Sequence, residues 1–268
     1  MSSFRWLAYL MGLVVVACSP APDSGSVSDA EADAGSARPA GQIDHAITDD
    51  KQAQGALMLT YVEQEPGIEP YVNRVIITAD FLRMDDGSDQ TDFTLFDRRA
   101  KVIYSVSHDD RTALELHEQN SEIESPIKLE LDEKKIDMVD APMIDGKTPQ
   151  HYRLMVNDQL CRDTIVVPGL HTEAVQAMRE FRQVLASVHR GNIPNTPVDM
   201  QDPCFLADDV FWHKRSLKFG FPIKEWTPTG FSRSLVDYKY NAPIGEDIFE
   251  IPAGYLRKTS SAGQEVDA

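Results

Sequence analysis

Residues 71–117 decide the fold, and they read YVNRVIITADFLRMDDGSDQTDFTLFDRRAKVIYSVSHDDRTALELH. Runs rich in Val, Ile, Phe and Tyr alternate here with turn signals such as DDGSDQ and RRAK. We interpret the first run as one long strand, on which four side chains share a face: Val75, Ile77, Ala79 and Phe81. This regular spacing of short strands and turns favours an antiparallel meander over βαβ units.

Similar strand-like runs continue on both sides of this stretch. They cover residues 55–64, 125–139, 148–158, 159–167, 210–220, 221–228, 230–241 and 247–255. One segment, 168–191, instead places apolar residues at helical spacing, with Thr172 near its start and His189 and Arg190 before Gly191 at its end. The fold class expected is therefore α+β, mostly β: an antiparallel sheet with one main helix.

The N-terminus has the features of an exported lipoprotein. The apolar run 6–17 is shorter than the roughly 20 residues that cross a bilayer and suits the core of a signal peptide. Residues 15–18, Val-Val-Ala-Cys, resemble a bacterial lipobox, in which Leu is usual at the first place. The resemblance implies cleavage after residue 17 and acylation of Cys18. The alternatives are an ordinary secreted protein or an uncleaved anchor.

The resemblance to lipoprotein signals also implies a location. Ser19 follows the cysteine, where Asp would argue for retention in the inner membrane. We therefore expect an outer-membrane anchor that faces the periplasm of a Gram-negative bacterium. Acylation at Cys18 would supply the two or more lipid signals that stable anchoring takes.

Charge excludes one class of partner. Loss of residues 1–17 leaves 25 basic against 43 acidic residues, a formal charge of −18. Nucleic-acid binding depends on Lys and Arg neutralising phosphates, so no nucleic-acid partner is expected. The acidity suits a domain that a lipid tethers rather than a peripheral membrane binder. The alternative is that it only keeps the chain soluble.

The two remaining cysteines form an even pair in an oxidising compartment. We expect a disulfide between Cys161 and Cys204, which would fasten the segment after the helix to the sheet. Two free thiols, or two metal ligands, are the alternatives, although no CxxC or HxxxC spacing supports a metal.

Composition divides the chain into four parts. Residues 1–17 are the expected signal peptide, and 18–50 a lipidated disordered linker that is too polar to bury a core. Residues 51–258 form one β domain, and 259–268 a flexible polar tail.

The pattern of the domain resembles the LolA/LolB-like periplasmic lipoprotein carriers, and more closely a family of uncharacterised bacterial lipoproteins with such a domain. The matching stretches are FLRMD (81–85), DFTLFDRRAKVIYSVSHDDRT (92–112), GFPIKEW (220–226) and DIFEIPAGY (247–255). The resemblance implies a strongly curved sheet, a half-open barrel, covered by the main helix. It also implies a lipid or acyl chain held between sheet and helix.

Eight side chains are candidates to line such a cavity: Leu57, Leu59, Ile77, Phe81, Phe93, Leu95, Val102 and Tyr104. The alternative is that they fill a solid core, as most apolar strand faces do. The first functional hypothesis is thus a binding module for a hydrophobic ligand, and the second an envelope interaction or structural protein with a filled core.

No motif points to catalysis, a metal or a cofactor. The sequence has no GxSxG elbow, no glycine-rich phosphate loop and no HExxH, so we expect no enzyme. Asp85, Asp86 and Asp89 could bind calcium but are better read as a turn, as are His108, Asp109 and Asp110. The remaining candidates are read as architecture: Trp212 and His213 start a strand, and Arg153 and Arg162 pair with carboxylates across the sheet surface.

Overall fold

The structure is a computed structural model that describes residues 55–88, 91–120, 122–137, 142–245 and 247–259. Its strands are β1 (Ala56–Gln64), β2 (Tyr71–Ile77), β3 (Phe81–Asp85), β4 (Phe93–Asp97), β5 (Val102–Ser107), β6 (Thr112–His117), β7 (Leu131–Ile136), β8 (Gln150–Val156), β9 (Gln159–Val167), β10 (Phe221–Trp226), β11 (Ser232–Ala242) and β12 (Leu256–Thr259). Its helical elements are α2 (Thr172–Asn192), η1 (Ile193–Asn195), η2 (Val198–Met200), α3 (Pro203–Phe205), η3 (Leu206–Phe211) and η4 (Ser216–Lys218). No helix in these ranges is long and apolar enough to cross a membrane.

The expected signal peptide (1–17), the acylated Cys18 and the linker (18–50) lie outside the described residues. The same holds for the polar tail except for Thr259, which ends β12.

All strands belong to one sheet in the order β12-β6-β5-β4-β3-β2-β1-β11-β10-β9-β8-β7. The meander β1–β6 forms one half, the antiparallel strands β7–β11 form the other, and the β1–β11 pair joins them. Strand β12 departs from the expected pattern because it pairs with β6 in parallel. Among the described strands β12 and β7 are not paired with each other, so the sheet is not closed into a barrel. The fold class is α+β, mostly β.

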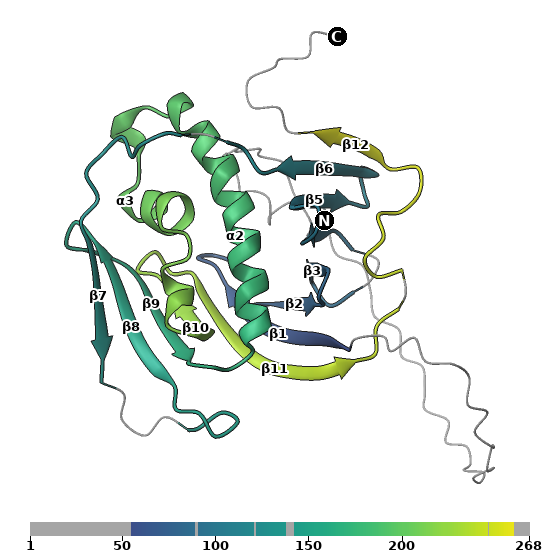
Figure 1. The fold of residues 1–268 in the computed structure, drawn as a ribbon, viewed down its shortest axis with the longest axis horizontal. Helices are drawn as coiled ribbons and strands as arrows, with labels where there is room; N and C mark the ends of the chain where they lie inside the picture. Colours follow the sequence, from purple (N-terminus) through teal and green to yellow (C-terminus); the bar gives the residue numbers. More distant parts are fainter. Residues whose placement is uncertain (1–54, 89–90, 121, 138–141, 246, 260–268) are drawn as a thin grey trace, which may run out of the picture.

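Helix α2 lies against one face of the sheet. Figure 1 shows the sheet bending so that its two halves lie on either side of the helix, and we call this inner side the concave face. Apolar side chains of α2, Ala174 to Val188, form a buried cluster with Leu59, Val75, Leu82 and Ile103. Each fully buried aliphatic side chain contributes about 1.5–3 kcal/mol. Arg98 fixes the helix further through an ion pair of 2.8 Å with Glu180.

The segment expected to be one long strand is a hairpin. Strands β2 and β3 pair in antiparallel fashion, and Thr78 closes the turn by accepting hydrogen bonds from the backbone N–H groups of Asp80 and Phe81. The hairpin leaves Ala79 exposed in the turn. It also places Phe81 on the face opposite Ile77, because Ile77 pairs with Leu82 instead.

Two other expected strands are not strands. Most of residues 203–218 are helical because Asp202 caps the segment, accepting a 2.7 Å hydrogen bond from the Phe205 N–H, and Pro203 occupies the first helical turn. Residues 247–255 contain turns and lie across the convex face, where Phe249 stacks on Phe81 with ring centroids 5.1 Å apart. The last strand, β12, follows this segment.

Candidate ligand cavity

An open cavity of about 710 Å³ lies at one end of the β2–β6 meander. The ends of neighbouring strands form it, together with the turn 65–70 before β2 and Lys258 of β12. None of its described lining residues belongs to α2. The cavity therefore lies beyond the part of the sheet that α2 covers. Its lining residues come from both faces of the strands: Met84 and Thr94 from the concave face, and Phe93 from the convex face.

The floor of the cavity is a row of residues across four strands. Each residue of this row lies directly opposite the next one on the neighbouring strand, from β3 to β6: Met84, Thr94, Ser105 and Leu114. Met84 also lies opposite Val75, which packs in the α2 cluster, so the row is on the concave face. The floor therefore combines two apolar side chains with two hydroxyl groups.

The turn side of the cavity adds apolar surface. Ile68 and Val72 line it, and Val72 is 42% exposed although it is a large aliphatic residue. Exposed apolar surface that lines a concavity is typical of ligand sites.

Carboxylates dominate the charges around the cavity. Besides Asp85, five acidic residues are among its described lining residues: Glu65, Glu69, Asp86, Asp92 and Asp110. The one cationic residue among the described lining residues is Lys258. Asp85 also lines the cavity, but its carboxylate forms ion pairs of 2.7 Å with Arg74 and Arg83 on the convex side.

Tyr71 links the cavity to a buried polar network. Its hydroxyl donates a hydrogen bond of 2.6 Å to Glu65 and lies 3.4 Å from Glu63. Burial and the hydrogen bond to Glu65 raise the pKa of Tyr71, so the side chain stays a neutral donor. Glu63 in turn accepts a hydrogen bond of 2.6 Å from Asn73 and lies 3.2 Å from Arg233.

Glu225 of β10 is the centre of that network. Arg162 and Arg182 approach its carboxylate at 3.5 and 3.9 Å, and Arg233 lies opposite it on β11. Burial raises the pKa of Glu225, but the three guanidinium groups outweigh burial and hold the pKa below its ordinary value. The carboxylate is therefore ionised inside the fold.

The eight side chains expected to line one cavity lie on two opposite faces. Leu57, Leu59 and Ile77 belong to the cluster under α2. Phe81, Phe93, Leu95 and Tyr104 form a second cluster with residues 249–255 on the convex face. Val102 is buried and is two residues from Tyr104 on β5, so it is on the same face as Tyr104. Of the eight, only Phe93 is among the described lining residues of the cavity.

The reason for this division is the turn at residues 78–80. If residues 71–85 formed one continuous strand, Phe81 would be on the same face as Ile77. In the hairpin, Phe81 is on the opposite face. With the turn recognised, alternation along β3 would place Leu82 and Met84 on the concave face. That signal could have identified the cavity floor.

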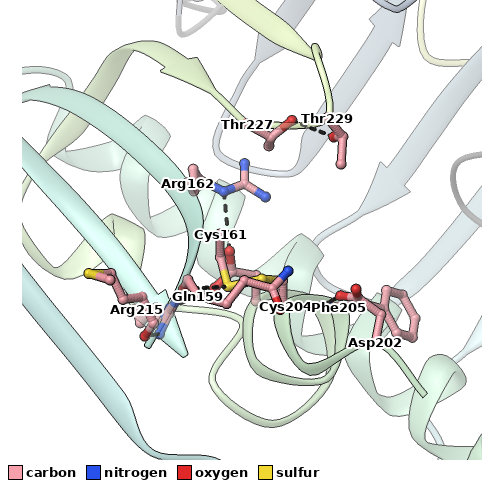
Figure 2. The surroundings of a disulfide bond; sticks show 11 residues. Gln159, Cys161, Arg162, Asp202, Cys204, Phe205, Arg215, Thr227 and Thr229 are labelled. Atoms are coloured by element: carbon pink, nitrogen blue, oxygen red, sulfur yellow. Dashed lines mark hydrogen bonds and ion pairs between the residues drawn. A yellow bond between two sulfur atoms is a disulfide. The ribbon is translucent and has the colours of Figure 1, made fainter. Parts of the chain in front are cut away.

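The disulfide expected between Cys161 and Cys204 is present. Figure 2 shows it joining β9 to α3, with Cα atoms 5.2 Å apart. It holds the helical segment 203–218 against the half of the sheet that contains the Glu225 network.

The acidic candidates for metal binding take other roles. Asp86 accepts hydrogen bonds from the Ser88 N–H and the Thr91 hydroxyl, as in a turn, while Asp89 lies outside the described residues. His108, Asp109 and Asp110 form the turn between β5 and β6, and His108 lies 2.7 Å from the Tyr255 hydroxyl.

The expectation of surface pairing is confirmed for Arg153, which lies 3.2 Å from Asp163 on the next strand. It is wrong for Arg162, which points to the concave side and pairs with Asp208 and Glu225. Trp212 and His213 follow η3 and do not start a strand.

Comparison with known proteins gives little further information. No protein-family model and no curated protein matches the chain. An uncharacterised conserved protein from Thermus thermophilus is structurally similar over 78% of this chain and 93% of its own, with a TM-score of 0.39 and 9% identity. PNGF-II is similar over 78% of this chain and 31% of its own, with a TM-score of 0.37 and 10% identity. TM-scores this low carry no argument about function.

Proposed function

We propose that this chain is a lipid-anchored protein of the bacterial envelope that binds a hydrophobic ligand in the cavity of the β2–β6 meander. The cavity carries the proposal: its volume of about 710 Å³ is within the range of ligand sites, roughly 300–1,000 Å³. Its floor joins apolar side chains, Met84 and Leu114, to the hydroxyls of Thr94 and Ser105. Such a floor suits an acyl chain or another elongated apolar group.

The LolA/LolB-like half-open barrel is part of the same proposal. An open sheet bent around one helix supports it. Cleavage after residue 17, acylation of Cys18 and an outer-membrane position facing the periplasm complete it, and the sequence of the first 19 residues supports them.

The second candidate is a structural or interaction lipoprotein without a ligand. The filled cluster between α2 and the sheet favours it, because Leu59, Val75 and Leu82 are almost fully buried there. On either proposal the space directly beneath the helix holds no ligand.

The test is a pair of matched substitutions in the full chain. Ser105 and Ser234 are both half-buried strand residues, but Ser105 lines the cavity and Ser234 is not among its described lining residues. Ser105→Trp should fill the cavity, and Ser234→Trp is the control. Each protein is purified in the same detergent, and its organic extract is analysed by mass spectrometry.

A hydrophobic compound present with the parent chain and with S234W, but lost with S105W, is the expected result. If no compound distinguishes the two variants although both fold, the cavity binds no co-purifying ligand and the second candidate is favoured.

A further inference from the structure

We propose that the cavity selects an amphiphile whose polar group is cationic, such as an amine or a quaternary ammonium; this rests on the proposed function. The apolar part would lie on the floor formed by Met84 and Leu114, and the cationic group at the rim. The preference concerns the class of ligand and goes beyond hydrophobic binding itself.

The charges at the rim carry the inference. Glu69 and Asp110 are exposed lining residues from opposite sides of the cavity, the β1–β2 turn and the β5–β6 turn. With Glu65, Asp86 and Asp92 they make five carboxylates besides the arginine-paired Asp85, against one cation, Lys258, among the described lining residues. A concave site lined by one sign of charge focuses the electric field and attracts the opposite charge.

Three neighbouring arginines, Arg74, Arg83 and Arg233, are not among the described lining residues of the cavity. Arg74 and Arg83 are paired with Asp85 on the convex side of the sheet. Arg233 is held by Glu63 and by the ring of Tyr61, 3.8 Å from its guanidinium carbon. A fatty-acid carboxylate would therefore meet mainly like charges at the rim, whereas an ammonium group would meet opposite ones.

Hydrogen bonds orient part of the acidic rim. The Tyr71 hydroxyl donates to Glu65, and the backbone N–H of His108 donates to Asp92 at 2.7 Å. These two contacts hold the carboxylates of Glu65 and Asp92 in place at the rim.

The experiment uses two photoreactive probes with the same twelve-carbon chain and the same diazirine position. One probe ends in trimethylammonium and the other in carboxylate. The full chain is labelled in one nonionic detergent, and mass spectrometry measures labelling of the peptides that contain Met84 and Leu114. The quantity compared is the ratio of cationic to anionic labelling at these peptides.

The matched variants separate rim charge from net charge and from partitioning into the micelle. E69K/D110K reverses two exposed rim charges. E173K/D199K makes the same change in net charge at exposed residues that do not line the cavity. We expect the parent chain to favour the cationic probe, E69K/D110K to lower the ratio at least threefold, and E173K/D199K to leave it nearly unchanged.

Salt supplies a second readout, because exposed charges are screened beyond about 8 Å at physiological ionic strength. The ratio should fall towards that of E69K/D110K as salt is raised. Equal labelling by both probes, or a ratio that the two double variants change alike, would overturn the cationic preference while leaving hydrophobic binding intact. Failure of both probes to label the cavity would overturn the proposed function itself.

Discussion

Glu225 of β10 and Arg233 of β11 lie directly opposite each other on the concave face of the sheet. Arg162 and Arg182 approach the same carboxylate, so one buried anion lies among three guanidinium groups. Removing one partner from such a group leaves uncompensated buried charge, which typically costs about 3–5 kcal/mol.

Glu225→Gln keeps the size of the side chain and removes its charge. We expect the free energy of unfolding at pH 7 to fall by about 3–5 kcal/mol, measured by urea denaturation. Glu122→Gln, at an exposed position, is the control and should change it by less than about 0.5 kcal/mol. A loss at Glu225 no larger than that of the control would contradict the role given to this carboxylate.

The pH dependence of Glu225 has a definite sign. Its pKa in the folded state is below the ordinary value of 4.5, so its ionisation stabilises the fold fully above pH 4.5. This contribution is lost as the pH falls below 4.5 and through the lowered pKa. The parent chain should therefore lose stability relative to E225Q in this acid range, and parallel stability curves would contradict the prediction.

His213 acts in a separate, higher pH range. Burial lowers its pKa from 6.5 to about 4, so the unfolded chain takes up a proton that the folded chain refuses. Stability should thus decrease as the pH falls from 6.5 to 4, by about 2–3 kcal/mol from this residue. His213→Gln should reduce the slope in that window. Part of the slope should remain in this variant, because burial also lowers the pKa of His171. An unchanged slope would show that His213 is not responsible.

The disulfide should stabilise the fold measurably. Cys161 and Cys204 are 43 residues apart, and the chain-entropy model gives about 4 kcal/mol for a loop of this size. The double variant C161S/C204S should lose about this amount in urea denaturation. The parent chain under reducing conditions should behave like the variant, and a parent chain indifferent to reduction would contradict the prediction.

Neighbouring residues on β3 test the boundary between filled core and open cavity. Leu82 is 1% exposed under α2, whereas Met84, two residues further on the same face, is half-buried at the cavity floor. Leu82→Ala should cost about 3–4 kcal/mol and Met84→Ala about 1 kcal/mol, measured by urea denaturation, because only Leu82 is packed on all sides. Equal losses of stability in the two variants would show that Met84 is packed as tightly as Leu82 and would contradict a boundary between them.

The strands and the main helix were predictable because their periodicity is strong. The α2 segment combines apolar residues at helical spacing with a basic C-terminus, and the structure has the helix at Thr172–Asn192. The disulfide followed from the even pair of cysteines that remains once Cys18 is assigned to a lipid. Most of the strands of the meander were likewise recognised from their turn signals.

The errors have local physical causes. The turn at Thr78 contains neither Gly nor Pro, so its side-chain hydrogen bonds are invisible to a composition rule. The aromatic residues of 210–220 favoured a strand, although Asp202 and Pro203 form a helix start that the sequence does display. Recognising the turn at Thr78 would have placed Met84 on the cavity floor, but the extent of the cavity depends on how much of the sheet α2 covers, which no local pattern shows.

The pairing of β1 with β11 also governs how the chain can be assembled. Ala56 lies opposite Ala242, so β1 finds one of its two neighbours only after β11, residues 232–242, has been synthesised. Contacts between such distant segments slow folding, since a long loop must close before they form. When the chain is synthesised from its N-terminus, β1 can pair with β2 early, but its other edge stays unpaired until β11 follows. The complete sheet can therefore form only after β11 has been synthesised, and until then the edge of β1 that β11 covers stays open.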